Sequence, residues 1–198
     1  MTFFTINLSS DKKNFFFTRL ENIYAEMEKR YEIVAGAIDF NCNNCLENCC
    51  YTHFQHHTLI EYLYLMEGLM SIDNKARKEI DEKAVEVAAA TKRADNAGEK
   101  IRIMCPVNKN GRCTLYSNRL MICRLHGTAH YFDTPKGRMA GPGCYRFEKL
   151  SKGKKSVPML DRTDMYRELA FLEMDVRKYT GFNDKFKYSI AEMISASL

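Results

Sequence analysis

Four cysteines lie within nine residues of one another in the first third of this chain, at Cys42, Cys45, Cys49 and Cys50. A downstream segment rich in turn-forming residues supplies four more: Cys105, Cys113, Cys123 and Cys144. Closely spaced thiolates suit a soft or borderline metal, because one loop brings several ligands together before the metal arrives. The sequence therefore predicts that all eight cysteines are metal ligands and that the two sets meet in space.

The compartment decides how eight cysteines are interpreted. The N-terminal stretch lacks the basic and apolar regions of a secretory signal peptide, and no apolar run approaches the roughly 20 residues that a membrane span requires. We therefore expect a cytoplasmic protein that does not enter a membrane. Cytosolic thiols are kept reduced, which favours metal ligation over the alternative of four disulfides. Burial of free cysteines as small hydrophobic side chains could explain one or two of them.

The number of thiols limits the choice of centre. Zinc takes four ligands and a 4Fe-4S cluster takes four thiolates, so eight cysteines allow two zinc ions, or one cluster with four cysteines left over. Side chains of adjacent residues diverge, so Cys49 and Cys50 are expected to serve different metals, or one of them to bridge. Cys42 and Cys45 have the spacing of a zinc or iron-sulfur knuckle.

Apolar residues at intervals of three or four predict helices over residues 14–38, 58–70, 73–95, 161–180 and, less clearly marked, 184–195. Thr58 and Glu61 form a capping-box pattern at the second of these helices, and Asp73 or Asn74 can cap the third. Glycine, proline and β-branched residues after residue 100 predict short strands over 101–104, 113–116, 128–132 and 138–140. The last two strands are expected to form a hairpin through the turn at residues 133–137, where Pro135 and Gly137 favour turn geometry.

These elements predict a mainly α protein with a small irregular or β cysteine-rich metal-binding centre, that is, an α+β fold. We expect a single domain over residues 1–198. Within it, residues 39–147 form the cysteine-cluster region, between the helices at 14–38 and 161–180.

The net charge of +5 invites a nucleic-acid interpretation. Eight thiolates around two zinc ions would, however, contribute a net −4 and bring the folded protein near +1. The one dense basic run, Lys152, Lys154 and Lys155, lacks interleaved aromatic residues and is typical of a solvated loop. We therefore expect a metal ion as the partner and not nucleic acid or a membrane, and the sequence identifies no protein partner.

Other candidate sites are weaker. Cys113 and Arg119 have the spacing of a phosphatase loop but no glycine between them, and Cys123 with His126 is better interpreted as a ligand beside a packed histidine. Polar loop histidines, with a lesser chance of metal ligation, are expected at His53, His56 and His57. Neither catalytic residues nor a glycine-rich nucleotide pocket can be assigned.

Several residues between the cysteines complete a recognisable pattern: Pro106, Gly111, Tyr116, Arg119 and Arg124. Together with the eight cysteines, this pattern resembles the YkgJ-type cysteine-cluster family, described as a zinc- or iron-chelating domain. The match covers about residues 39–147, with Cys45 one residue early and Leu120 in place of the usual proline. The resemblance implies metal binding through all eight cysteines. A related domain occurs in flagellin lysine methylases.

The favoured hypothesis is a metal-binding protein that holds zinc or iron through eight cysteines, with the iron as ions or as an iron-sulfur cluster. The alternative is an iron-sulfur-dependent redox or protein-modifying enzyme related to flagellin lysine methylases. A third hypothesis is an interaction protein that docks through the Tyr- and Met-rich helix at residues 58–70.

Overall fold

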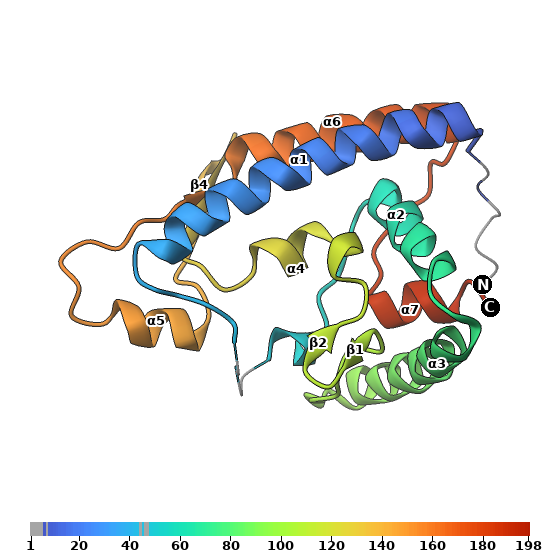
Figure 1. Cartoon of the computed structure of the whole chain (residues 1–198), viewed down its shortest axis with the longest axis horizontal. Helices are drawn as coiled ribbons and strands as arrows, with labels where there is room; N and C mark the ends of the chain where they lie inside the picture. Colours follow the sequence, from blue (N-terminus) through green and yellow to red (C-terminus); the bar gives the residue numbers. More distant parts are fainter. Residues whose placement is uncertain (1–5, 7, 44, 46–47) are drawn as a thin grey trace.

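Two long antiparallel helices frame the computed structural model, which describes residue 6 and residues 8–43, 45 and 48–198. Helix α1 (Ser10–Gly36) and helix α6 (Thr163–Thr180) lie side by side (Figure 1). Near the start of α1, Phe16 contacts Tyr179 with ring centroids 5.8 Å apart, and Arg19 pairs with Asp175. The helices predicted at 14–38 and 161–180 are confirmed with small shifts in their ends.

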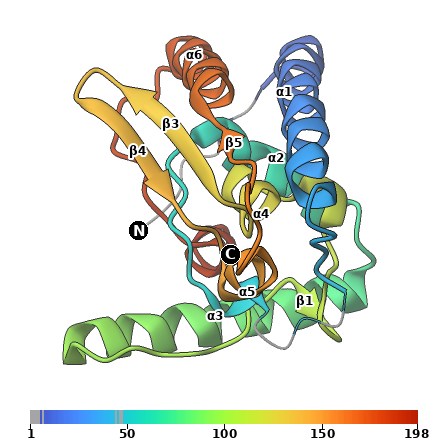
Figure 2. The ribbon, with the colours of Figure 1, turned by 90° about the vertical axis from the view of Figure 1, so that its left-hand side faces the viewer.

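Three further helices lie below this pair. Helix α3 (Asn74–Ala97) packs against the short helix α7 (Ile190–Ser195). Helix α2 (Leu59–Met70) packs against α1 and α6 and lies between these two long helices and the α3–α7 pair (Figures 1 and 2). The predicted cap of α3 is confirmed, because the Asp73 carboxylate accepts hydrogen bonds from the backbone of Lys75 and Ala76. The last helix is shorter than predicted and begins at a capping box formed by Ser189 and Glu192.

Helix α2 is buried on most sides within this single chain. Its buried apolar residues include Leu59, Ile60, Tyr62, Tyr64, Leu65 and Leu69. Met70, at the C-terminal end, is exposed. The hypothesis of an interaction protein that docks through this helix needs the apolar face to be exposed, and its burial argues against that hypothesis.

The cysteine-rich middle of the chain consists of short elements. They are the 3₁₀ turn η1 (Cys49–Tyr51), the hairpin of β1 (Asn108–Lys109) and β2 (Arg112–Cys113), the 3₁₀ turn η2 (Tyr116–Asn118), helix α4 (Met121–Leu125) and helix α5 (Tyr145–Ser151). The strand predicted at 101–104 is wrong, since this segment is irregular, and the one at 113–116 survives only as the end of β2. Helices α4 and α5 are too short to show a helical period in the sequence.

A second small sheet has the strand order β4-β3-β5. Strand β3 (His130–Thr134) pairs antiparallel with β4 (Gly137–Gly141), which confirms the predicted hairpin, and parallel with β5 (Leu160–Asp161). Directly after β5, the buried guanidinium of Arg162 donates a hydrogen bond to the carbonyl oxygen of Leu125. The start of α6 is thereby fixed to the end of α4.

Helices and small sheets together give an α+β fold, as predicted at this coarse level. One cluster of buried residues runs through the molecule and includes Leu20, Met27, Leu65, Leu120, Leu125 and Leu172. None of the helices in the described part of the chain is both long and apolar enough to cross a bilayer.

Candidate metal centre

All eight cysteines carry free thiols. Cys42 and Cys45 lie in the loop after α1, and Cys49 and Cys50 begin η1. The downstream cysteines are placed by four separate elements: Cys105 precedes β1, Cys113 ends β2, Cys123 lies in α4 and Cys144 is the N-cap of α5. Cys42 is exposed and the other seven are half-buried.

The backbone brings Cys50 to the downstream cysteines. The N–H of Cys105 donates to the carbonyl oxygen of Cys50 at 2.9 Å, and the Asn48 side chain donates to the carbonyl oxygen of Gly111 in the β1–β2 hairpin at 3.1 Å. The thiols then interact electrostatically as a set of four: Cys50, Cys105, Cys113 and Cys123. We call these four cysteines the inner group.

Donors surround the inner group. The backbone N–H groups of Val107 and Leu115 hydrogen-bond to the sulfurs of Cys105 and Cys113, each two residues further along the chain. Val107 and Leu115 lie on either side of the β1–β2 hairpin. Each of these bonds lowers the pKa of its thiol and so favours the thiolate that a metal requires.

Asn108 adds a side-chain donor to the inner group. This residue is buried, and its Nδ2 has no partner at conventional hydrogen-bond geometry in the described residues. Its Oδ1 accepts from Gly111, which leaves the amide hydrogens to act on Cys50, whose pKa they lower. An orphaned buried donor beside a sulfur is stabilised when that sulfur becomes a thiolate.

The remaining cysteines lie toward α5. Cys144 donates its N–H to the carbonyl oxygen of Gly127 at 2.9 Å, and Phe40 packs against Phe147 of α5 with ring centroids 5.3 Å apart. The Tyr31 side chain interacts with the thiols of Cys42, Cys49 and Cys144, and Cys42 also interacts with Cys45. We call Cys42, Cys45, Cys49 and Cys144 the outer group.

The adjacent pair joins the two groups. The thiol of Cys49 hydrogen-bonds to the sulfur of Cys50, which raises the pKa of Cys49 and lowers that of Cys50. Cys49 interacts with Cys42 and also with Cys123, so it lies between the groups. The inner group already has four thiols without it, which is why we count it with the outer group.

Burial and nearby cations act in opposite directions on the inner thiols. Burial raises the pKa of Cys105 to about 12 and that of Cys123 well above its ordinary value. The guanidinium groups of Arg119 and Arg124 lower the pKa of Cys113, and Arg119 also lowers that of Cys50. A bound cation would overcome the remaining cost of burying these thiolates.

The thiols are neighbours without forming a finished coordination shell. Among residues 6, 8–43, 45 and 48–198, no three His, Cys, Asp or Glu side chains converge closely enough to hold a metal ion as they stand. The residues therefore fit a metal in donor type, in neighbourhood and in the donors directed at sulfur. Binding requires thiol side chains to rotate toward a common point.

Glu61 holds the N-terminal end of helix α4, whereas the sequence predicted that it would cap helix α2. The predicted capping box is wrong, because Thr58 makes no hydrogen bond to a backbone N–H and donates its hydroxyl to Glu61 at 2.6 Å. The buried Glu61 carboxylate also accepts from the Tyr24 hydroxyl at 2.9 Å and from the N–H of Met121 at 2.5 Å. It thus holds the first residue of the helix that carries Cys123. An acidic residue inside an otherwise apolar helical stripe was the available signal.

The histidines have structural surroundings. His53 contacts the Ile103 carbonyl oxygen and the Thr91 hydroxyl, and His126 packs on the Phe54 ring. His56 is buried and its backbone pairs with Tyr188. His126 is packed as expected, whereas His56 was expected in a polar loop and is buried.

His56 should make stability depend on pH. Burial, and then the charge of His57, lower the pKa of His56 from 6.5 to about 4. The unfolded chain therefore binds a proton more readily than the folded chain, so this contribution is full above pH 6.5 and falls as the pH drops toward 4. We expect about 2.5 kcal/mol to be lost between pH 7 and pH 4.5. Urea unfolding at both pH values should show this loss in the wild type and not in His56→Gln. Equal losses in the two proteins would contradict the assignment, because protonation of the cysteines affects both alike.

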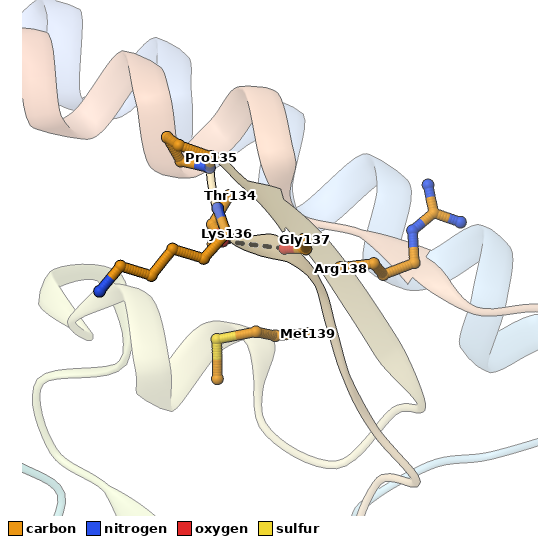
Figure 3. A pocket seen from close by; sticks show the side chains of 6 residues that line it. All are labelled: Thr134, Pro135, Lys136, Gly137, Arg138 and Met139. Carbon is orange, nitrogen blue, oxygen red and sulfur yellow. Dashed lines mark hydrogen bonds between the residues drawn. The ribbon is translucent and has the colours of Figure 1, made fainter.

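A surface hollow lies at the tip of the β3–β4 hairpin and contains none of the cysteines. Its lining residues run from Thr134 to Met139. Figure 3 shows the side chains of Lys136 and Arg138 extending to opposite sides. The two cations do not converge, so the hollow offers no anion site.

Two distant parts of the sequence thus meet at the candidate centre, since Cys50 lies beside Cys105 through a backbone hydrogen bond. The adjacent residues Cys49 and Cys50 interact with each other, and Cys49 also interacts with Cys42 of the outer group and Cys123 of the inner group. The residues between the cysteines supply amide, carboxamide and guanidinium donors. No family model, curated protein or solved structure matches the chain.

Proposed function

We propose that this chain is a metal-binding protein that holds zinc or iron through its eight cysteines. The observation that carries the proposal is the inner group, in which four thiols from three separate segments are neighbours and three of them, Cys50, Cys105 and Cys113, have hydrogen-bond donors directed at their sulfurs. Four thiolates match the coordination number of zinc and the ligand count of a 4Fe-4S cluster. Bound metal would supply the positive charge that keeps buried thiolates ionised.

A metal role also accounts for the charge and the compartment. Free thiols suit a reducing compartment, and we place the protein in the cytoplasm on that basis. Arg119 and Arg124 pair with Glu28 and also lower the pKa of Cys113, so they would serve as counter-charges to Glu28 and to the thiolates and not as part of a basic surface for nucleic acid. The partner proposed is a metal ion.

The alternative function is an iron-sulfur-dependent redox or protein-modifying enzyme. It is favoured by the number of thiols, which exceeds what one structural ion requires. It would use one group for a cluster and leave the other thiols for a different task. The described residues identify no catalytic group for such an enzyme.

Elemental analysis and an absorption spectrum on protein prepared without oxygen test the proposal. We expect about two zinc ions per chain in a colourless protein, and cobalt substitution should give the thiolate charge-transfer bands of tetrahedral sites. A brown protein with acid-labile sulfide would support the alternative. Protein that purifies without metal and binds neither zinc nor iron under reducing conditions would overturn both.

A further inference from the structure

We propose that the two cysteine groups hold two separate ions that exchange at different rates, with a slowly exchanging ion in the inner group and a readily exchanged ion in the outer group. This inference rests on the proposed metal binding and adds a division of labour to it. The inner ion would hold the fold together. The outer ion would be available to other metal-binding molecules.

The inner ligands are held by hydrogen-bonded backbone on every side. Cys50 lies in η1, whose first turn is closed by the bond from its N–H to the Asn48 side chain at 2.9 Å. Cys113 is in the β1–β2 hairpin, which pairs it with Asn108. Cys123 lies in α4, where Glu61 holds the N–H of Met121. An incoming ligand would have to break several of these contacts to displace one sulfur.

The inner group is also electrostatically prepared for thiolates. The guanidinium of Arg124 is buried and donates to the carbonyl oxygens of Arg119 and Ser117, so its position is fixed beside α4. With the two amide–sulfur bonds and Asn108, these groups stabilise the ligands in the charged form. If the ion dissociated, Arg124, Asn108 and the two amide donors would face protonated thiols in place of thiolates, which disfavours release of the ion.

The outer group opens to solvent at its Cys42 end, although Cys144 is held by its backbone bond to Gly127 and Tyr31 hydrogen-bonds to Cys42. Cys42 is exposed, and the backbone bond between the Cys45 N–H and the Cys42 carbonyl oxygen is long, at 3.3 Å. Arg146 is a cation that acts on Cys42, and its guanidinium donates to the carbonyl oxygen of Asn43 in an exposed setting. A chelating ligand can therefore reach the outer ion from solvent. Exchange at that ion forms new bonds between the metal and the chelator, while each released thiolate takes up a proton from the buffer.

Transfer of zinc from the loaded full-length chain to a chromogenic chelator, followed in a stopped-flow instrument with reductant present, tests the inference. We expect two phases of one ion each, with rates at least tenfold apart. Cys144→Ser should remove the fast phase and keep the slow one, whereas Lys149→Ala, a control on the same helix, should keep both. A single phase that releases two ions, or loss of the slow phase in Cys144→Ser, would overturn the inference.

Cadmium NMR makes the test independent of variants. Wild-type protein loaded with ¹¹³Cd should give two thiolate-ligated resonances, and a chelator added below one equivalent should remove one before the other. Equal loss of both resonances would overturn the inference while leaving the proposed metal binding intact. Protein that binds no metal would instead overturn the proposed function, and one 4Fe-4S cluster per chain would replace the two-ion arrangement with the alternative function.

Discussion

Removing the metal with a strong chelator under reducing conditions is expected to unfold residues 99–144 while α1 and α6 keep their pairing. Besides its cysteines, the segment contains four short strands, the 3₁₀ turn η2 and the five-residue helix α4, and elements of this length are not stable alone. Metal at a thousandfold above its dissociation constant contributes about 4 kcal/mol of stability per site, which would be lost. Hydrogen exchange should show loss of amide protection there and retention in α1 and α6.

Zinc added back to the same sample is the control, since it should restore the protection pattern if the thiols have stayed reduced. The long helices should survive because their packing uses apolar residues such as Leu20 and Leu172 and not the thiols. Unchanged exchange and thermal unfolding after verified metal removal would show that the middle of the chain folds without an ion.

Glu61→Ala is expected to lower the free energy of unfolding by about 4 kcal/mol. The change leaves the Tyr24 hydroxyl and the Met121 N–H without their acceptor in a buried place. It also frees the first turn of α4, so Cys123 should be less well positioned. Chemical denaturation of the metal-loaded protein measures the first effect. A zinc competition titration should show weaker binding of the inner ion with little change at the outer one.

Glu67→Ala is the matched control, because it removes the same side chain from the same helix. Glu67 pairs with Lys13 at 2.9 Å, and both side chains are about one-third exposed. Exposed pairs of this kind contribute roughly 0–1 kcal/mol, so the control should be nearly as stable as the wild type. Similar stability losses in the two variants would mean that the Glu61 network contributes little.

The longer helices could be predicted from the sequence because their stripes are long enough to show a period. Asp73 or Asn74 could be predicted as the cap of α3, because a capping residue acts on neighbours one to three positions away, and Asp73 is the residue that caps the helix. The β3–β4 hairpin was predictable from Pro135 and Gly137 in its turn. Each of these features depends on residues close together in the chain.

The features that were missed depend on distant partners. Glu61 has a suitable neighbour in Thr58, but its decisive contacts are to Tyr24 and Met121, which sequence spacing cannot reveal. The divergence of adjacent side chains suggested that Cys49 and Cys50 serve different metals or that one of them bridges, but it could not show that Cys50 lies beside downstream thiols. The division of the eight cysteines into two groups follows from the folded backbone.

The pairing of α1 with α6 also has a consequence for the order of events during synthesis. Every cysteine precedes Thr163, where α6 begins, so a ribosome incorporates all eight cysteines before it makes the second long helix. The nascent chain can then capture an ion while its long-range closure is still incomplete. Metal supply during translation would in that case influence how much of this protein matures correctly.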